Sequence, residues 1–336
     1  MRIFITGVAG FLGSYVADSM LDLGYEVIGV DNLVGGYLDN VNKKVRFYKA
    51  DCGDLELMKK YSEGCDVVFH AACTAHDGLS VFSPYFITQN TFGITMSVLS
   101  AAIQNNVKKF VYCSSMSRYG YQEKVPFQED TVCNPQVPYA VAKYASERII
   151  EKLAKLNHME YVIVVPHNII GPRQNYTDPY RNVAAIMINR ILQGKKPIIY
   201  GNGEQKRCFS FINDVVYCIE KVITMDGLNG QVINIGPDEE YITVNYLAQK
   251  IAELIGVDFE PIYIPARPLE VMHANCSSDK ARRLLGYKTS TTLEEGLLQM
   301  IEYIKNRGPK EFSYHKIPVE IQNERTPENW IQPQKF

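Results

Sequence analysis

The feature that most constrains the fold is a regular alternation of short apolar runs with helix-like stretches through the first half of the chain. The apolar runs cover residues 2–7, 26–31, 45–51, 66–72, 109–115 and 161–166, and the helix-like stretches cover residues 14–23, 55–62, 88–105 and 139–157. Because these runs are apolar almost without a break, they suit parallel strands that are covered on both faces. The sequence therefore predicts an α/β protein with a doubly wound parallel sheet and right-handed crossovers.

The composition and pattern of the sequence change after the last of these runs. Proline and glycine become common, the apolar runs shorten to stretches such as KPIIYG and QVINIG, and longer loops separate the helices. We expect residues 1–166 to form the first domain, with a segment near 209–236 returning to its sheet, and residues 167–308 to form a smaller α/β lobe. Residues 309–336 are polar, contain several prolines and hold the only tryptophan, Trp330. They are expected to form a C-terminal arm on the surface.

Composition excludes several classes of protein. With 336 residues, of which 46% are hydrophobic and 21% charged, the chain can bury a full core, and its net charge of −2 offers no basic surface for nucleic acid. The eight cysteines occur singly, with no C-x-x-C pair and no metal-ligand spacing, which is typical of free thiols in a reducing compartment. No signal-peptide pattern is present, and no apolar run approaches the roughly 20 residues of a membrane span. We therefore expect a cytoplasmic protein without a metal, a membrane segment or a nucleic-acid partner.

The segment ITGVAGFLGS places three glycines, Gly7, Gly10 and Gly13, directly after the first apolar run. Glycine permits a tight turn, close approach of the backbone to a pyrophosphate, and close packing of helix on strand, while the helix N-terminus offers N–H groups to the phosphates. An ordinary strand-to-helix turn is the alternative. Asp31 at the end of the second run adds a second mark, because an acid there accepts from ribose hydroxyls and repels a 2′-phosphate. The pattern predicts a Rossmann-type site that binds NAD rather than NADP, with Asp51 either contacting the adenine or serving only as a turn residue.

A second constellation lies in the segment VPYAVAKYASERI. Tyr139 and Lys143 are four residues apart and therefore share one face of a helix. A neighbouring ammonium favours the phenolate and lets a tyrosine act as a general base. Most such pairs only decorate a helix surface, but this pair follows a strand that ends in Ser114 and Ser115. The carboxyl ends of strands in a doubly wound sheet face the ligand, so we expect these side chains to converge.

Together these residues resemble the extended short-chain dehydrogenase/reductase superfamily, and in particular its NAD-dependent nucleotide-sugar epimerases and dehydratases. The matching segments are TGVAGFLGS, Asp31, HAA, TQNTFG, SSMSRYG, YAVAK, PHNIIGPRQ and YGNGEQKRCFSFINDVV, with weaker marks through SSDKARRLLGY. The resemblance covers most of the chain and fades after about Gly308.

The resemblance implies a role for each matching residue. Tyr139 would take the proton of the sugar hydroxyl, Lys143 would tune Tyr139 and hold the nicotinamide ribose, and Ser115 would steady the developing oxyanion. The implied cofactor-binding set, partly through backbone groups, is Gly7, Gly10, Phe11, Leu12, Gly13, Asp31, Asn32, Asp51, Cys52, Ala71, Ala72, Asn90, Tyr139 and Lys143.

Residues in the second half resemble the family's contacts to a nucleoside diphosphate. Asn168, Arg207 and Arg267 match residues that hold the diphosphate, and arginine gives charge-assisted hydrogen bonds to phosphate oxygens. Tyr200 matches an aromatic residue that flanks the base. Glu270 stands where the family usually has an aspartate and can still accept from a ribose hydroxyl. The implied substrate-binding set is completed by Ser115 and Tyr139.

The residues after Ser115 separate two reactions of the family. Related 4,6-dehydratases place an Asp-Glu pair there to eliminate water, whereas this chain has Met116 and Ser117. Neither side chain is an ordinary carboxylic acid, so the leading prediction is a UDP-sugar 4-epimerase that works through a transient 4-keto sugar. The sugar could be a hexose, an N-acetylhexosamine or a uronate. Ala274, counted from Arg267, falls where a small residue leaves room for an N-acetyl group.

Several alternatives stay open at this point. They are a dehydratase or oxidoreductase with an atypical acid, and a non-catalytic NAD-binding regulatory protein. Arg118 either pairs with an acid at the margin of the core or meets an anionic sugar. His76 and His167 either approach the site or are hydrogen-bonded structural histidines. The helices expected over 88–105 and 139–157 resemble the pair that forms the family's dimer interface, so a homodimer is expected.

Overall fold

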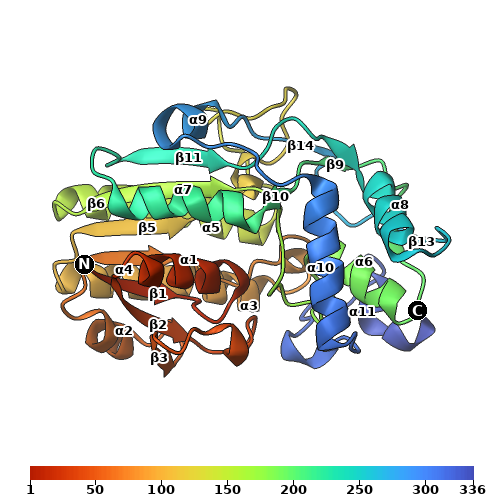
Figure 1. Ribbon diagram of the computed structural model, residues 1–336, viewed down its shortest axis with the longest axis horizontal. Helices are drawn as coiled ribbons and strands as arrows, with labels where there is room; N and C mark the ends of the chain where they lie inside the picture. Colours follow the sequence, from red (N-terminus) through yellow and green to blue (C-terminus); the bar gives the residue numbers. More distant parts are fainter.

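The computed structural model describes all 336 residues and has a seven-stranded parallel sheet at its centre (Figure 1). The strand order is β11-β6-β5-β4-β1-β2-β3. The strands are β1 (Arg2–Thr6), β2 (Glu26–Asp31), β3 (Arg46–Lys49), β4 (Val67–His70), β5 (Lys109–Cys113), β6 (Glu160–Pro166) and β11 (Gln231–Ile235). This architecture confirms the predicted doubly wound α/β fold, and each predicted strand is present with ends shifted by one or two residues.

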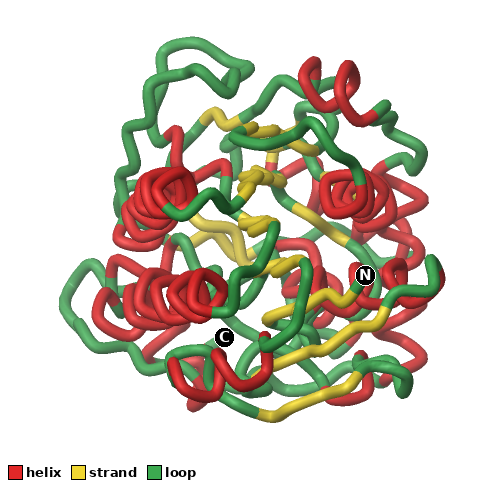
Figure 2. Tube along the Cα trace, turned by 90° about the vertical axis from the view of Figure 1, so that its left-hand side faces the viewer, coloured by secondary structure: helices red, strands yellow, loops and turns green.

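Helices cover both faces of this sheet, as Figure 2 shows from the side. On one face α1 (Phe11–Asp22), α7 (Ile212–Thr224) and α9 (Asp279–Leu285) pack in one apolar cluster with Ile3 and Ile5. On the other face α2 (Leu55–Ser62), α4 (Ile94–Gln104) and α5 (Pro138–Leu156) pack around Phe4. Successive side chains of β1 thus point to opposite cores, which is why the apolar runs are continuous rather than alternating.

A smaller lobe lies beyond the carboxyl ends of the strands (Figure 1). Three helices share its core: α6 (Val183–Leu192), α8 (Val244–Ile255) and α10 (Leu293–Arg307). Short strands pair as β7 (Ile169–Ile170) with β10 (Ser210–Phe211), and β8 (Ile198–Tyr200) with β13 (Ile262–Ile264). A third small sheet joins β12 (Ile242–Thr243), β9 (Lys206–Arg207) and β14 (His273–Ala274). The boundaries expected for the domains stay a prediction.

The segment expected as one helix over 88–105 is three pieces. Helix α3 (Pro84–Thr88) begins earlier, with proline at its first position, where a missing N–H costs nothing. A π-helical turn, Gln89–Gly93, then precedes α4. In this turn the Asn90 side chain donates to the Phe86 carbonyl (2.9 Å), and the Asn90 carbonyl accepts from Thr74 N (3.0 Å). No apolar spacing reveals a π turn, so the sequence could not predict it.

His70 at the end of β4 connects the sheet to helix α4. Its Nδ1 lies 2.7 Å from Thr6 Oγ1 and its Nε2 lies 3.0 Å from Thr95 Oγ1. Complete burial lowers the pKa of His70 to about 3. The folded protein therefore keeps this ring neutral in a pH range where the unfolded chain protonates it. No helix of the structure is both long and apolar enough to cross a membrane.

We predict that His70 makes the protein sensitive to acid. The unfolded chain binds the extra proton below a pKa of about 6.5, so stability is lost as pH falls from there toward the folded value. Between pH 6.5 and pH 5 this residue alone should lower the free energy of unfolding by about 2 kcal/mol. Urea unfolding at both pH values checks this. A His70→Asn variant should lose that part of the pH dependence, whereas exposed His315→Gln should keep it.

Candidate active site

A cavity of about 530 Å³ lies between the carboxyl edge of the main sheet and the smaller lobe. Its inner end is at the glycine loop after β1, beside β4, where the strand order reverses, which is the usual ligand position in open α/β sheets. Every residue that the sequence assigned to the cofactor, the substrate or catalysis lines this cavity. The sequence-derived set thus converges in space, although the role of each residue stays a prediction.

The glycine loop permits a close approach of backbone to backbone and to a ligand. Gly7 has φ +74°, and a Cβ on it would lie 2.9 Å from Ala72 N. A Cβ on Gly13 would lie 2.1 Å from the Gly7 carbonyl oxygen. Sequence reasoning missed Gly36, which also lines the cavity and whose Cβ would lie 2.3 Å from the Ala9 carbonyl oxygen. This cradle fits a pyrophosphate, because nothing larger than hydrogen is tolerated where the loop and helix α1 meet.

We predict that Gly13→Ala removes the cofactor from the protein. The added methyl group must push the Gly7 carbonyl aside, and both sides of that contact are backbone. The purified variant should therefore hold less than a tenth of the NAD content of the wild type. Absorbance or chromatography of the denatured supernatant measures it. Gly24→Ala is the control for a glycine substitution outside the cavity, because its Cβ would meet nothing within 4 Å. Its φ of +80° makes alanine cost about 1 kcal/mol of stability, but the NAD content should not change.

The acid at the end of β2 is already oriented. Asp31 is buried and accepts from Ala9 N (3.1 Å) and Leu33 N (2.7 Å), which leaves carboxylate lone pairs for a ribose. Burial raises the pKa of Asp31, and these backbone N–H groups lower it in part. Asn32 is exposed and donates to Asp51 Oδ2 (3.2 Å). These two residues therefore form one polar rim beside Asp31.

The apolar members of the cofactor set have a double role in the structure. Phe11, Leu12 and Ala71 pack against the apolar cluster under α1, while Cys52 and Ala72 belong to the cluster on the opposite face. Each of them also lines the cavity. They are core residues whose outer surfaces close the inner end of the cavity.

The two residues of the helix pair lie at the centre of the cavity. Tyr139 and Lys143 are both almost fully buried in α5. The Lys143 ammonium donates to the Cys113 carbonyl at the end of β5 (2.7 Å) and lies 6.0 Å from the centre of the Tyr139 ring. Ser115 follows β5, and its hydroxyl interacts with the Tyr139 phenol and lowers that group's pKa. The structure thus brings the expected trio together.

Burial dominates the electrostatics of Tyr139. It raises the pKa of the phenol above its ordinary value, and the charges of Lys143 and Arg181 act in the opposite direction. Lys143 therefore lowers the pKa of the Tyr139 phenol, as the sequence predicted, but its effect is smaller than that of burial. The pKa of Lys143 is itself raised, because the nearby Cys73, Tyr112 and Tyr139 outweigh the effect of its burial. This ammonium is charged at any physiological pH.

Arg118, whose role the sequence left open, holds the serine loop onto helix α5. Its guanidinium forms a buried ion pair with Glu147 (Nη1 to Oε2, 3.1 Å), and the Ser114 hydroxyl donates to the other Glu147 oxygen. Burial raises the pKa of Glu147 to about 7, and the Arg118 charge partly opposes this. Arg118 does not line the cavity, so the first of its two expected roles is confirmed. Glu147 lies one helical turn after Lys143, and this clamp therefore fixes Ser115 relative to the pair.

The outer part of the cavity carries the residues expected for a nucleoside diphosphate. Arg207 donates to the carbonyls of Lys206, Val271 and Met272, at 2.6 to 3.2 Å. Arg267 pairs with Glu270 (2.5 Å), and its guanidinium lies 4.8 Å from the centre of the Tyr200 ring. Both guanidinium groups are anchored, both residues line the cavity, and each keeps N–H groups without a partner in the protein, as phosphate recognition requires.

Asn168 borders the same part of the cavity. Its side chain donates to the Cys208 carbonyl (2.8 Å) and lies 3.7 Å from Met116 Sδ. Its backbone has φ +43°, a left-handed conformation that asparagine tolerates better than most residues. His167, the residue before it, is buried against the Pro237 carbonyl and does not line the cavity.

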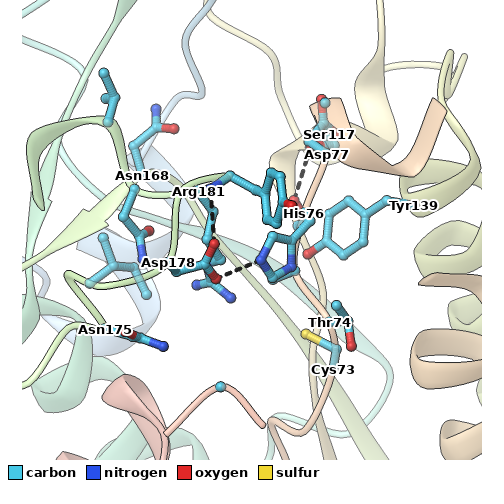
Figure 3. A pocket seen from close by; sticks show the side chains of 18 of the residues that line it. Cys73, Thr74, His76, Asp77, Ser117, Tyr139, Asn168, Asn175, Asp178 and Arg181 are labelled. Atoms are coloured by element: carbon cyan, nitrogen blue, oxygen red, sulfur yellow. Dashed lines mark hydrogen bonds and ion pairs between the residues drawn. The ribbon is translucent and has the colours of Figure 1, made fainter. Parts of the chain in front are cut away.

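The sequence named His76 as a residue that either approaches the site or is structural, and the structure places it on the cavity wall beside Asp178 and Arg181, which sequence reasoning missed (Figure 3). His76 and Asp178 form a buried pair (Nε2 to Oδ2, 2.7 Å), and Tyr139 points toward the same space. Arg181 lies beside them with no ion pair of its own. Nothing local could have revealed a pair whose members are separated by 102 residues.

Asp77 is the second missed group. Its side chain is open to the cavity although it lies deep in the molecule, next to Ser117 (Figure 3). Burial raises the pKa of its carboxyl group, while the Ser117 hydroxyl and the charge of Arg267 lower it in part. Related dehydratases carry acids at the positions of Met116 and Ser117, and this chain does not. The structure places the Asp77 carboxyl group beside the second of these positions, Ser117.

A Rossmann-type sheet with a glycine cradle and a Ser–Tyr–Lys trio that lines the cavity defines an NAD-dependent enzyme of the short-chain dehydrogenase/reductase type. A family model described as the NAD dependent epimerase/dehydratase family matches residues 3–236. The chain therefore belongs to the NAD-dependent epimerase/dehydratase family, which confirms the resemblance, and NAD is the cofactor of this family.

Individual relatives match nearly their whole length. A UDP-glucose 4-epimerase of Mycolicibacterium smegmatis is 33% identical and aligns over 92% of this chain and 100% of its own. The structure of a UDP-glucose 4-epimerase with UDP-glucose from Thermotoga maritima is 34% identical, with a TM-score of 0.85, over 91% of this chain and 99% of its own. A UDP-N-acetyl-alpha-D-glucosaminuronate decarboxylase of Bacillus cytotoxicus is 29% identical and aligns over 90% of this chain and 98% of its own.

Proposed function

We propose that this enzyme is a UDP-sugar 4-epimerase that oxidises the sugar at C4 and then reduces the 4-keto sugar on its other face. The observation that carries the proposal is the trio of half-buried Ser115 with buried Tyr139 and Lys143, next to a loop with Met116 and Ser117 in place of the dehydratase acids. The chain is an epimerase-family enzyme, and the named relatives act on UDP-sugars, which supports the choice of UDP.

The chemistry that NAD supplies when bound is reversible acceptance of a hydride from C4. Tyr139 takes the C4 hydroxyl proton in the first half of the reaction and returns it in the second. Lys143 favours the ionised phenol through its charge, and Ser115 donates a hydrogen bond to the developing C4 oxyanion. Arg207 and Arg267 hold the diphosphate while the keto sugar rotates.

The shape of the outer cavity bears on which sugar is accepted. Ala274 lines the cavity from β14, in register with Arg207 on β9. A methyl side chain at this position leaves space beside the diphosphate end, which supports N-acetylhexosamines as substrates besides hexoses.

A second candidate reaction is favoured by Asp77. Its carboxyl group lies beside Ser117 and is open to the cavity, and its raised pKa favours the protonated form that a general acid needs. With this group the 4-keto sugar could pass the C5 proton to the Asp77 carboxylate, and the C6 hydroxyl would take that proton and leave as water. The hydride held by the cofactor would then return to C6. The enzyme would then be a dehydratase with an acid supplied from the loop after β4.

One experiment separates these reactions. The purified enzyme is incubated with UDP-glucose, UDP-N-acetylglucosamine, UDP-glucuronate, GDP-mannose and dTDP-glucose, and the products are analysed by NMR and mass spectrometry. Epimerisation gives an inverted C4 with unchanged mass, whereas dehydration gives a mass lower by one water. Retained NAD with no change in any of these sugars would favour the regulatory alternative.

A homodimer is also part of the proposal. Helices α4 and α5 are the pair through which it would form, and α5 exposes Val141 and Leu156. Light scattering after size exclusion measures the mass in solution. A Val141→Glu variant that stayed dimeric would argue for another interface.

A further inference from the structure

The C-terminal arm, residues 309–336, is attached to both sides of the cavity. On the side of the NAD-binding sheet, the Glu320 carboxylate accepts from the N–H groups of Tyr85 (2.9 Å) and Phe86 (2.7 Å) at the start of α3. On the side of the smaller lobe, Asn189 donates to the Lys310 carbonyl (2.8 Å). The arm therefore crosses from one side of the cavity to the other, and it does more than lie on the surface as the sequence predicted.

An aromatic cluster holds the end of the arm in place. Trp330, in the short helix α11 (Glu328–Ile331), is 4% exposed. Its ring packs edge-on against Phe82, Tyr180 and Tyr200, with centroids 5.4 to 6.2 Å apart. Tyr180 and Tyr200 belong to the cavity wall, and Phe82 packs in the same apolar cluster behind it, so contacts with the wall fix the position of the arm.

Part of the arm forms the wall at the end of the cavity farthest from the glycine loop. Phe312, Tyr314, Ile317 and Asn329 line this end together with Tyr200. The arginines assigned to the diphosphate lie between this end and Tyr139. A nucleotide sugar whose diphosphate is held there and whose sugar reaches Tyr139 places its base against the arm.

Asn329 has unused hydrogen-bonding capacity at this wall. It is 6% exposed, and its only side-chain partner is the Tyr200 hydroxyl, which lies 2.9 Å from Nδ2 and 3.1 Å from Oδ1. A primary amide has two N–H donors and an oxygen with two lone pairs. At least one donor and one lone pair therefore remain. Uracil presents an N–H between two carbonyls, which is complementary to such an amide edge.

We propose that the arm is the base-binding wall of the nucleotide-sugar site, and that Asn329, held by Tyr200, recognises the uracil ring of the substrate. This inference rests on the proposed function, because it takes the ligand to be a nucleotide sugar. The arm begins where the family's sequence marks end, and the solved UDP-glucose 4-epimerase aligns over 99% of its own length but only 91% of this chain. Base recognition by an arm is thus a feature of this chain's own residues.

The test is calorimetric binding of UDP and ADP to the NAD-loaded enzyme. Asn329→Leu keeps the volume of the side chain and removes its polar atoms, so UDP should bind about tenfold more weakly, as expected for one lost hydrogen bond between neutral groups. ADP binding and NAD content should not change. Tyr200→Phe should weaken UDP in the same direction, and the double variant should lose less than the sum of the two, since both act through one contact. Exposed Glu324→Gln, also on the arm, is the matched control.

A second variant ends the chain after Gly308. The three large apolar clusters contain no residue of the arm, so this variant should fold and keep NAD while UDP binding falls at least a hundredfold.

Unchanged UDP affinity in Asn329→Leu, or tighter UDP binding after truncation, would overturn the inference. If the variants bind UDP as expected but the wild-type enzyme converts no UDP-sugar, the inference about the arm stands and the proposed reaction is wrong. A wild-type enzyme that binds no UDP would remove both.

Discussion

Replacing the central phenol by a phenyl ring, Tyr139→Phe, should lower kcat for C4 epimerisation by about 10²–10⁴-fold, the range of a positioned general acid–base group. The ring is 5% exposed in a packed wall, so the variant should keep its fold, its NAD and its affinity for UDP. Single-turnover and steady-state kinetics with the best UDP-sugar measure the loss. Because only the hydroxyl is removed, the change should fall on kcat rather than on KM.

The pH dependence gives this prediction a second readout. Burial raises the pKa of the Tyr139 phenol, so the ionised fraction, and with it the rate, should climb as pH rises from neutral into the alkaline range. That climb should vanish in Tyr139→Phe. Tyr144→Phe is the matched control, since it removes a hydroxyl from the same helix outside the cavity. A Tyr139→Phe enzyme with more than a tenth of the wild-type rate would refute the proposed mechanism.

The parts of the site that the sequence predicted are those fixed by local chemistry. The glycines, Asp31 and the Tyr139–Lys143 pair each belong to one strand end or one helical turn, where spacing along the chain determines spacing in three dimensions. Their convergence at one edge follows from the parallel sheet alone. The apolar runs determine that sheet, because each strand must bury both of its faces.

The parts that the sequence could not predict depend on contacts between distant segments. His76 meets Asp178, and Asn329 meets Tyr200 across 129 residues. No periodicity or motif links such positions, because the contact exists only after both lobes have packed. Asp77 was missed for another reason: an aspartate in a loop is ordinary, and only the cavity shows that its side chain is open to a ligand.

Arg118 shows how a residue outside the cavity can control the site, and Arg118→Met should lower the free energy of unfolding by about 3–5 kcal/mol. The pair that it forms with Glu147 is almost completely buried, with side chains 7% and 3% exposed. Removing the guanidinium leaves a carboxyl group that must carry an unpaired charge or take up a proton. Ser114 keeps Glu147 as its partner, but Arg118 no longer holds that carboxyl group in place, so the loop that carries Ser115 should loosen and kcat should fall with the stability.

The size of this loss should depend on pH in a defined direction. Burial already raises the pKa of Glu147 to about 7, and without the positive charge of Arg118 it should rise further. The folded variant then binds a proton that the unfolded chain has released above about pH 4.5, so its stability falls as pH increases, and the deficit relative to wild type should be larger at pH 8 than at pH 6. Urea unfolding at the two pH values measures it.

Two further variants show whether the buried pair is the cause. Arg148→Met removes an arginine from an exposed pair with Glu151 on the same helix, where the side chains are 54% and 21% exposed, so it should cost at most about 1 kcal/mol. The double variant Arg118→Met/Glu147→Gln removes both charges of the buried pair and should recover much of the stability lost in Arg118→Met, since it is the uncompensated charge that is costly. Catalysis should not recover with it, because Ser115 would still lack the clamp that fixes it beside Tyr139. A double variant as unstable as Arg118→Met would mean that packing of the arginine side chain, and not its charge, holds the loop in place.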